Sequence, residues 1–396
     1  MLIADDSPSL TADEAAHSER VAAHIRALIA GAGGWLSFSR FMDAALYAPG
    51  LGYYMTGRPI FGAEGDYVTA PELSPLFAAC LASALAELLA KTGGDEIVEF
   101  GAGSGLLAVM VLMGLARRDA LPRRYRIVEV SPVLRDRQRA FFDRFPGVAA
   151  LRDRVEWLDA PPGDDWQGVA LANEVADALP VERFRLRAGG CDVLGVAADG
   201  DGFRWQSRPA DAPIAEAVGW IQSLLPDPMP EGFVSEFCPG LRAWIEGATA
   251  RLTRGAMLVI DYGLPRSQYY HASRDGGSLC GFRRHRRIEN VLACPGIQDL
   301  TAWVDFSALA DAAKACGMET GGFATQAHFL ISIGIERELA ALVEGAEERD
   351  RLALNHTAAT LLLPGEMGER FKVMALTRGI ERTLSGFAFR DLSASL

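Results

Sequence analysis

The stretch EIVEFGAGSGLLAVMVLMGLA, residues 96–116, is the most apolar part of this 396-residue chain, yet it holds three closely spaced glycines. From Phe100 to Ala116 it carries no charge. A membrane-spanning helix needs about 20 predominantly apolar residues. The uncharged run has 17 residues, contains four glycines and directly follows Glu99. We therefore reject a membrane span.

The stretch divides into a strand, a turn and a helix. The segment 96–100 is short, contains β-branched residues and is bounded by glycines on both sides, which is typical of a fully buried parallel strand. A helix is expected from residue 104 or 105 to the two arginines at 117 and 118, because cations suit a helix C-terminus. The glycines between them allow a tight turn and let backbone N–H groups approach a ligand. This pattern is typical of the first βα unit of a nucleotide-binding α/β sheet.

The glycine spacing indicates which nucleotide is bound. Gly101, Gly103 and Gly105 form G-x-G-x-G. The dinucleotide fingerprint is G-x-G-x-x-G, and Leu106 stands where its third glycine would be. The observed spacing resembles motif I of class I S-adenosylmethionine (SAM) methyltransferases. Glycine triplets also occur in plain turns, and an NAD-dependent oxidoreductase stays as an alternative.

The next two strands add candidate cofactor-binding carboxylates. A strand over 125–130 places Glu129 at its carboxyl end, where a carboxylate can accept hydrogen bonds from both ribose hydroxyls. A surface glutamate at a strand end is the structural alternative. A strand over 154–160 places Asp159 at its end. In class I methyltransferases an acidic or polar residue at this position often contacts the adenine amino group. A turn-forming aspartate before two prolines is the alternative there.

Polar side chains also follow the fourth and fifth strands. Asn173 ends the fourth strand, and Glu174 and Asp177 follow it. The fifth strand delivers Asp261 and Tyr262. Because ligands bind at the carboxyl ends of such parallel strands, we expect these side chains to face the site. The alternative for Asn173 or Asp177 is the capping of a short helix.

Composition and charge limit the class of protein. The net charge is −12 at pH 7, and such a chain repels phosphate backbones, which disfavours a nucleic-acid substrate. Six cysteines and six histidines are scattered without zinc-ligand spacing, so we expect free thiols in a reducing compartment and no metal site. The acidic N-terminus, MLIADDSPSLTADEAAHSER, argues against a secretory signal or a transit peptide. We expect a cytoplasmic enzyme without membrane insertion.

Several further elements are expected outside these strands. They are helices at 12–30 and 74–90, an antiparallel β insertion at 183–208, helices around Trp220 and Trp244, and late strands at 327–335 and 370–379. The one basic cluster is Arg283, Arg284, His285, Arg286 and Arg287. A solvated loop is the ordinary interpretation of such a run, and orientation of an acidic partner is the alternative.

Eight motifs in this order resemble those of the MidA-type SAM-dependent methyltransferases. They are GYYM (52–55), GDYVTAPE (65–72), VEFGAGSG, VEVSP, NEVADALP, IDYG, PGIQDLTAWVDF (295–306) and MGERFKVMALTRG (367–379). The best-known members are the mitochondrial complex I assembly-factor methyltransferases, and the resemblance covers nearly the whole chain. It implies a class I SAM-methyltransferase fold, which is an α/β Rossmann-like sheet with a helical N-terminal extension and an inserted substrate region.

This resemblance divides the chain into four segments. Residues 1–92 would form the N-terminal helical extension with the GDYVTAPE loop, and residues 93–182 the first part of the SAM-binding core. Residues 183–254 would form the inserted β and helical substrate region, and residues 255–396 the remainder of the core sheet.

The resemblance also implies a methyl acceptor, because the mitochondrial members methylate an arginine of a complex I subunit. Carboxylates can clamp a guanidinium, concentrate lone-pair density on one nitrogen and accept the released proton. We expect Glu174 and Asp177 to form this clamp, with Asp66 and Glu72 as a lid from the N-terminal region. The residues expected to hold SAM are Glu99, Gly101, Gly103, Gly105, Glu129, Asp159 and Asn173.

Two departures from the family pattern concern the acceptor. The chain has T-A-P-E at 69–72 where the family has T-S-P-E, which removes a hydroxyl. It has Ala176 where the family has a bulky residue, which widens the acceptor side of the pocket. A small-molecule acceptor, or a SAM-binding assembly factor with little turnover, therefore stays as an alternative.

The composition suggests a bacterial relative, and a homodimer is compatible with the family.

Overall fold

The computed structural model describes residues 10–58, 60, 74–145, 147–381 and 383–396. The chain forms two compact units, and it enters each of them more than once. Unit 1 consists of Met1–Tyr67, Asp177–Gly240 and Pro265–Asp305, and unit 2 consists of Val68–Ala176, Leu241–Leu264 and Phe306–Leu396. The four consecutive segments expected from the sequence divide the chain in a different way and stay a prediction.

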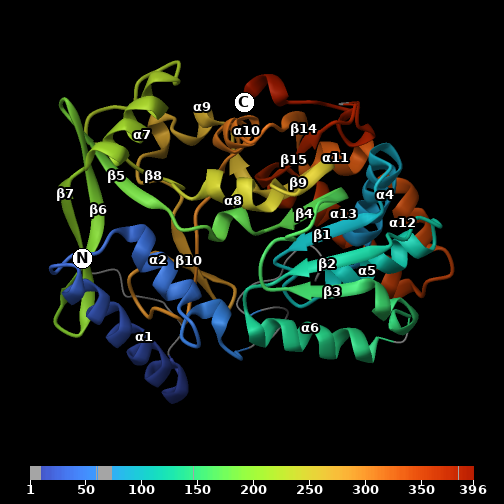
Figure 1. Ribbon diagram of the computed structural model, residues 1–396, viewed down its shortest axis with the longest axis horizontal. Helices are drawn as coiled ribbons and strands as arrows, with labels where there is room; N and C mark the ends of the chain where they lie inside the picture. Colours follow the sequence, from blue (N-terminus) through green and yellow to red (C-terminus); the bar gives the residue numbers. More distant parts are fainter. Residues whose placement is uncertain (1–9, 59, 61–73, 146, 382) are drawn as a thin grey trace. The chain divides into compact units, whose positions relative to one another are not determined.

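Unit 2 is built on one mostly parallel sheet with the strand order β14-β15-β9-β4-β1-β2-β3 (Figure 1). Its strands are β1 (Glu96–Phe100), β2 (Arg124–Val128), β3 (Val155–Leu158), β4 (Trp166–Asn173), β9 (Leu252–Leu264), β14 (Glu319–Thr325) and β15 (Phe371–Arg378). The neighbours from β9 to β3 run parallel, whereas β15 is antiparallel to both β9 and β14. The α/β class with a mostly parallel central sheet is confirmed.

Helices pack around this sheet. They are α4 (Pro75–Thr92), α5 (Leu106–Ala116), α6 (Pro132–Arg144), α8 (Leu241–Thr249), α10 (Phe306–Ala315), α11 (Gln326–Ser332), α12 (Ile335–Val343), α13 (Glu348–Leu362) and α14 (Met367–Arg370). Helix α4 lies against β4, β9, α5 and α12, and α10 lies against α8, β9, β14 and β15. β1 is buried over its whole length and β4 is buried over residues 168–172, as expected for central parallel strands that are covered on both faces.

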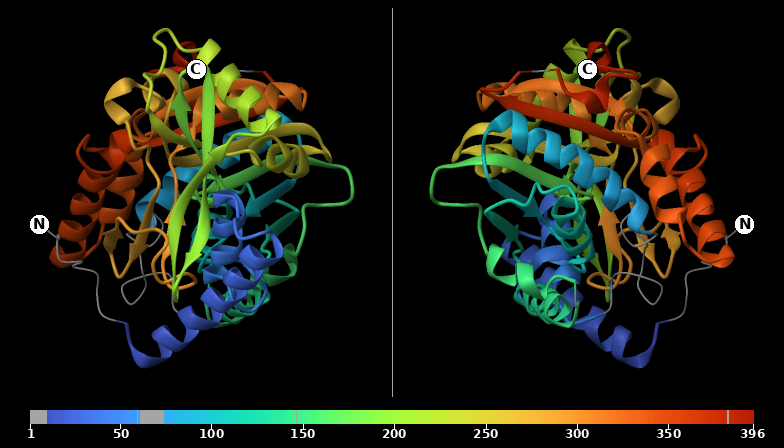
Figure 2. Two further views of the ribbon diagram at one scale, coloured as in Figure 1. Left: turned by 90° about the vertical axis from the view of Figure 1, so that its left-hand side faces the viewer. Right: turned by 90° about the vertical axis from the view of Figure 1, so that its right-hand side faces the viewer.

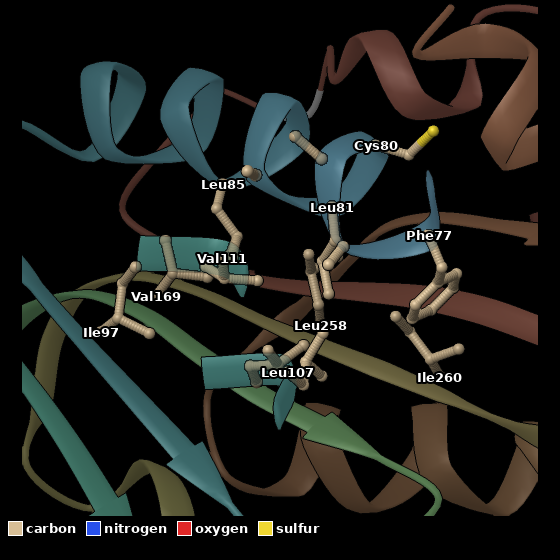
Figure 3. Packing of buried hydrophobic residues seen from close by; sticks show 14 of the residues in the cluster. Phe77, Cys80, Leu81, Leu85, Ile97, Leu107, Val111, Val169, Leu258 and Ile260 are labelled. Atoms are coloured by element: carbon tan, nitrogen blue, oxygen red, sulfur yellow. The ribbon is translucent and has the colours of Figure 1, made fainter. Parts of the chain in front are cut away.

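The core of unit 2 lies between α4, α5 and the sheet. Figure 3 shows Leu81 and Leu85 of α4 directed toward the strands that carry Val169 and Leu258. By length and composition alone, α4 could cross a membrane, but 67% of its most apolar window is buried inside the protein. It therefore fits a core helix whose apolar sequence is matched by the surrounding core.

Most elements expected from the sequence are confirmed, including the strand at 96–100 and the helix that follows the glycines. The late strand expected at 327–335 is wrong. Residues Gln326–Ser332 form helix α11, whose N-cap Thr325 accepts a hydrogen bond from the His328 N–H at 3.2 Å. The strand beside β15 is β14, immediately upstream.

Unit 1 contains two antiparallel sheets, with the orders β7-β6-β5-β8 and β11-β10-β12. The strands are β5 (Glu182–Arg187), β6 (Gly190–Asp199), β7 (Gly202–Pro209), β8 (Val234–Phe237), β10 (Cys280–Arg283), β11 (Arg286–Ile288) and β12 (Asp299–Thr301), followed by the short β13 (Val304–Asp305). The helices are α1 (Ala12–Gly31), α2 (Phe38–Tyr47), α7 (Ala212–Ser223) and α9 (Arg266–Tyr269). The expected antiparallel insertion at 183–208 is confirmed.

The segment between α1 and α2 packs on the β6–β7 hairpin, which faces the viewer in the left-hand view of Figure 2. The Trp35 indole N–H donates to the Gln206 carbonyl at 2.9 Å, and Leu36 forms an isolated β-bridge with Val196. A Cβ at Gly195 would lie 2.3 Å from the Trp35 ring, so this position requires glycine. These contacts join the N-terminal helices to the inserted strands within unit 1.

Candidate functional site

The glycine loop after β1 forms the centre of the candidate site in unit 2. Gly101, Gly103 and Gly105 all have positive φ angles, of 63°, 55° and 84°. Residues other than glycine rarely adopt this backbone conformation, so the path of the loop requires glycine at these three positions. Gly105 is the N-cap of α5 and makes no side-chain capping hydrogen bond. The Leu106 N–H at the helix start donates to the Ser104 hydroxyl at 3.4 Å. The next N–H groups of the first turn have no acceptor within the helix and can bind a negatively charged ligand group.

Hydrogen bonds hold this loop in place. The Gly101 N–H donates to the Val128 carbonyl at 3.0 Å, and the Gln138 amide donates to the Gly103 carbonyl at 2.9 Å. A Cβ at Gly101 would lie 3.0 Å from Val175. The loop is thus fixed against β2, α6 and the segment after β4.

Glu129 lies beside the loop, one residue after β2, and its side chain is buried. One carboxylate oxygen accepts the Ser131 N–H at 3.0 Å, and the other accepts the Gln138 amide at 3.2 Å. Burial raises the pKa of Glu129, although these two hydrogen bonds oppose the shift. Each oxygen has two lone pairs, so each can accept one more donor. Two hydroxyls of a ribose would supply those donors.

Gln138 links the parts of this site, and the sequence analysis did not identify it. It is fully buried on α6, and besides its bonds to Gly103 and Glu129 it accepts the Trp157 indole N–H at 3.0 Å. A single glutamine in a helix rich in arginine and aspartate carries no sequence signal for this role.

Glu99 is buried in β1, and its carboxylate accepts a 2.8 Å hydrogen bond from the Tyr125 hydroxyl. Burial raises the pKa of Glu99 to about 7, and the negative charge of Glu129 adds to the shift. Asp159 differs from both, because it is exposed just beyond the end of β3. A direct cofactor contact by Glu99 or Asp159 stays a prediction.

The end of β4 has an unusual backbone. Glu174 has a φ of 55°, in the left-handed region, although it is not a glycine. The Asn173 amide donates to the Glu174 carboxylate at 3.1 Å, and the Glu174 N–H donates to the Ile260 carbonyl at 2.9 Å. Among the described residues, the Asn173 Oδ1 atom is buried without a hydrogen-bond partner. A strained residue held in this way is typical of a functional position.

Asp261 positions the segment that follows Glu174. It is fully buried at the carboxyl end of β9, and it accepts the Ala176 N–H at 3.0 Å and the Tyr262 N–H at 2.9 Å. Both carboxylate oxygens therefore bind backbone. This arrangement gives Asp261 a positioning role.

Unit 2 thus brings together the glycine loop, Glu129, Asn173 and Glu174 at the carboxyl ends of its strands. Asp177 belongs to unit 1, where it is buried and its carbonyl accepts the Ala302 N–H at 3.0 Å. The clamp formed by Glu174 and Asp177 therefore stays a prediction. Asp66 and Glu72 lie outside the described residues.

Comparison with known proteins identifies the family. A family model described as "Putative S-adenosyl-L-methionine-dependent methyltransferase" matches residues 80–324, which is more than half of the chain. The chain is a MidA-type SAM-dependent methyltransferase. The resemblance read from the eight motifs is confirmed.

Solved structures support this membership. A Burkholderia thailandensis protein bound to S-adenosyl-homocysteine is 41% identical, with a TM-score of 0.91 over 98% of this chain and 100% of that chain. A native structure from the same organism is 40% identical, with a TM-score of 0.89 and the same coverage. The class I methyltransferase fold and the cofactor SAM are confirmed.

Curated relatives are more distant in sequence. The human protein arginine methyltransferase NDUFAF7, mitochondrial, is 30% identical over 87% of this chain and 80% of its own length. The zebrafish protein of the same name is 28% identical over 87% of this chain and 83% of its own length.

The site of unit 2 fits this cofactor. Glu129 has acceptor capacity for two hydroxyls, and the glycine loop leads into the start of α5, where N–H groups of the first turn lack acceptors within the helix. The buried, unpartnered Asn173 Oδ1 could accept a donor from the amino group of a ligand. These residues would bind and orient SAM, which supplies an electrophilic methyl group.

Proposed function

We propose that this enzyme transfers the methyl group of SAM to an arginine side chain of a protein. The proposal is supported by relatives named as protein arginine methyltransferases, which align with 87% of the chain. Sequence identities of 28–30% leave the acceptor as the part that needs a test.

The observation that carries the proposal is the conformation of Glu174. Its carboxylate belongs to a residue in a strained backbone conformation, and Asn173 holds that carboxylate from the side. An arginine guanidinium is protonated and delocalised at any ordinary pH, so its nitrogens are poor nucleophiles. A carboxylate that binds the guanidinium localises its lone-pair density on one nitrogen.

In the proposed step, that nitrogen forms a bond to the methyl carbon while the carbon–sulfur bond breaks and its electron pair remains on sulfur. The methylated nitrogen then releases its proton, and Glu174 accepts it. Asp177 is the second proposed carboxylate of the clamp. Asp66 and Glu72 remain proposed lid residues.

The test uses purified protein, SAM with an isotopically labelled methyl group, and a library of peptides that each contain a central arginine. A matched library with lysine in place of arginine is the control. We expect label in methylated arginine after acid hydrolysis, with none in the lysine library. Label found only in small molecules of a cell extract would overturn the proposal, and so would SAM binding without any transfer in either material.

A further inference from the structure

Gln138 on α6 contacts both the glycine loop and Glu129, and its side chain is fully buried. Its amide nitrogen lies 2.9 Å from the Gly103 carbonyl oxygen and 3.2 Å from a carboxylate oxygen of Glu129. Its amide oxygen lies 3.0 Å from the indole nitrogen of Trp157 on β3. A glutamine amide offers two N–H donors and one acceptor oxygen. Gln138 therefore uses both donors and its oxygen in these three contacts.

The hydrogen bond from Trp157 favours one of the two orientations of this amide. An indole N–H only donates, whereas a carbonyl and an ionised carboxylate only accept. The amide oxygen must therefore face Trp157, and the NH₂ group must face Gly103 and Glu129. If the amide turned by 180°, its oxygen would lie against the Glu129 carboxylate. Without the indole donor, the amide oxygen would be a buried acceptor without a partner, and the side chain would relieve this cost by leaving its position.

The Trp157 ring is itself held by contacts from two segments of unit 2. The Phe142 ring of α6 meets it edge-on, with 5.4 Å between the ring centroids. The guanidinium groups of Arg139 on α6 and of Arg152, in the 3₁₀ helix Ala149–Arg154, lie over the indole at 5.5 and 4.6 Å from its centroid. The indole N–H therefore has a defined direction toward Gln138.

The amide orientation matters for the cofactor because it fixes the Glu129 carboxylate. The last torsion of a glutamate side chain is broad unless its oxygens are bound. One Glu129 oxygen accepts the Ser131 N–H at 3.0 Å, and the other accepts the Gln138 amide at 3.2 Å. If the Gln138 donor moves away, one oxygen is released and the carboxylate can turn. A ribose that needs both oxygens would then be bound less tightly.

We propose that Trp157 is a positioning residue for SAM, which acts through Gln138 to hold the Glu129 carboxylate toward the two ribose hydroxyls. Trp157 lies on β3, at one end of the sheet order, and two hydrogen bonds in series join its indole to Glu129. The inference rests on the assignment of the ribose to Glu129 and is independent of the methyl acceptor.

The test measures the affinities of S-adenosyl-homocysteine and of its 2′,3′-dideoxy analogue by isothermal titration calorimetry. Trp157→Phe keeps an aromatic ring and removes the indole N–H. Trp166→Phe makes the same change at the start of β4, at a buried tryptophan whose indole nitrogen has no hydrogen-bond partner among the described residues, and is the matched control. Gln138→Met keeps the length of the side chain and removes the amide. The double variant Trp157→Phe/Gln138→Met shows whether Trp157 acts through Gln138.

We expect the wild type to bind S-adenosyl-homocysteine at least about tenfold more tightly than the dideoxy analogue, because two hydrogen bonds to a carboxylate are at stake. Trp157→Phe should weaken binding of S-adenosyl-homocysteine about three- to tenfold, with a smaller loss for the analogue. Gln138→Met should reduce the preference for the hydroxylated ligand in the same way, and the double variant should bind it as Gln138→Met does. Trp166→Phe should match the wild type for both ligands.

A general disturbance of the fold by Trp157→Phe would weaken both ligands equally, and that result would overturn the inference. It would also be overturned by a further loss in the double variant relative to Gln138→Met, or by an unchanged ligand preference in Gln138→Met. Equal affinities of the wild type for the two ligands would refute the ribose assignment and the inference with it. Because binding is measured without methyl transfer, failure here is distinct from failure of the proposed function.

Discussion

The strained backbone at Glu174 allows the effect of this residue on the stability of the protein to be separated from its effect on activity. Glu174→Gly and Glu174→Ala both remove the carboxylate and its hydrogen bond from Asn173. They differ only in a Cβ, which the positive φ of 55° disfavours. A third variant, Glu174→Gln, keeps the length of the side chain and the Asn173 hydrogen bond but removes the charge.

The expected magnitudes follow from this geometry. A left-handed backbone costs a residue with a Cβ about 1–2 kcal/mol. Glycine avoids this strain, but its freedom in the unfolded chain costs roughly 0.5–1 kcal/mol on folding. Both variants lose one hydrogen bond worth about 1 kcal/mol. The free energy of unfolding of Glu174→Gly should therefore exceed that of Glu174→Ala by about 1 kcal/mol, or roughly 1 °C in melting temperature for a chain of this length.

The assay combines urea unfolding with methyl-transfer kinetics. All three variants should lose about 100-fold or more in kcat, because the proton acceptor is removed. The affinity of Glu174→Gln for SAM should be unchanged, since Glu174 serves the acceptor. If Glu174→Ala proves as stable as Glu174→Gly, the residue is not strained. If Glu174→Gln turns over at the wild-type rate, Glu174 is not the base.

Three further predictions concern unit 2. Glu129→Ala should weaken SAM binding about 10- to 100-fold in calorimetry, because two hydrogen bonds to a carboxylate are lost; unchanged affinity would refute the ribose assignment. Burial raises the pKa of Glu99 from 4.5 to about 7, so the folded protein keeps a proton that the unfolded chain loses over this range. Stability should fall as pH rises through this range, and Glu99→Gln should flatten the fall in urea-unfolding curves; parallel curves would contradict the shift. Arg378 donates to the carbonyls of Thr249, Leu252 and Cys316. Arg378→Met should lower the free energy of unfolding by about 2–4 kcal/mol, given three lost hydrogen bonds, and an unchanged urea midpoint would refute this.

β1 and β4 could be predicted because each is a short segment of mostly apolar residues bounded by turn residues. The glycine loop was equally clear, since three positive φ angles require the three glycines that the sequence shows. β14 was hidden for a physical reason. A Cβ at Gly321 would lie 2.6 Å from Thr377, and one at Gly322 would lie 2.3 Å from Phe387. Because this packing requires glycines, β14 lacks the run of β-branched residues that predicts a strand. The apolar sequence of α11, which follows β14 in the chain, predicts a strand instead.

The connections within the site could not be predicted, because they join distant parts of the chain. Gln138 on α6 bonds to Gly103 and to Glu129, and it accepts from Trp157 on β3. Periodicity places Gln138 on a helix but does not indicate which loop it reaches. The strain at Glu174 is likewise a property of the folded backbone and not of its side chain.

The most direct test of the site is a crystal structure of this protein with S-adenosyl-homocysteine bound. The distances from the Glu129 carboxylate to the two ribose hydroxyls are the decisive quantities. We predict that both fall within hydrogen-bonding range, with the glycine loop against the amino-acid end of the ligand and the Glu174 carboxylate facing the sulfur. A ribose held by other residues, or a Glu174 carboxylate directed away from the sulfur, would contradict the account.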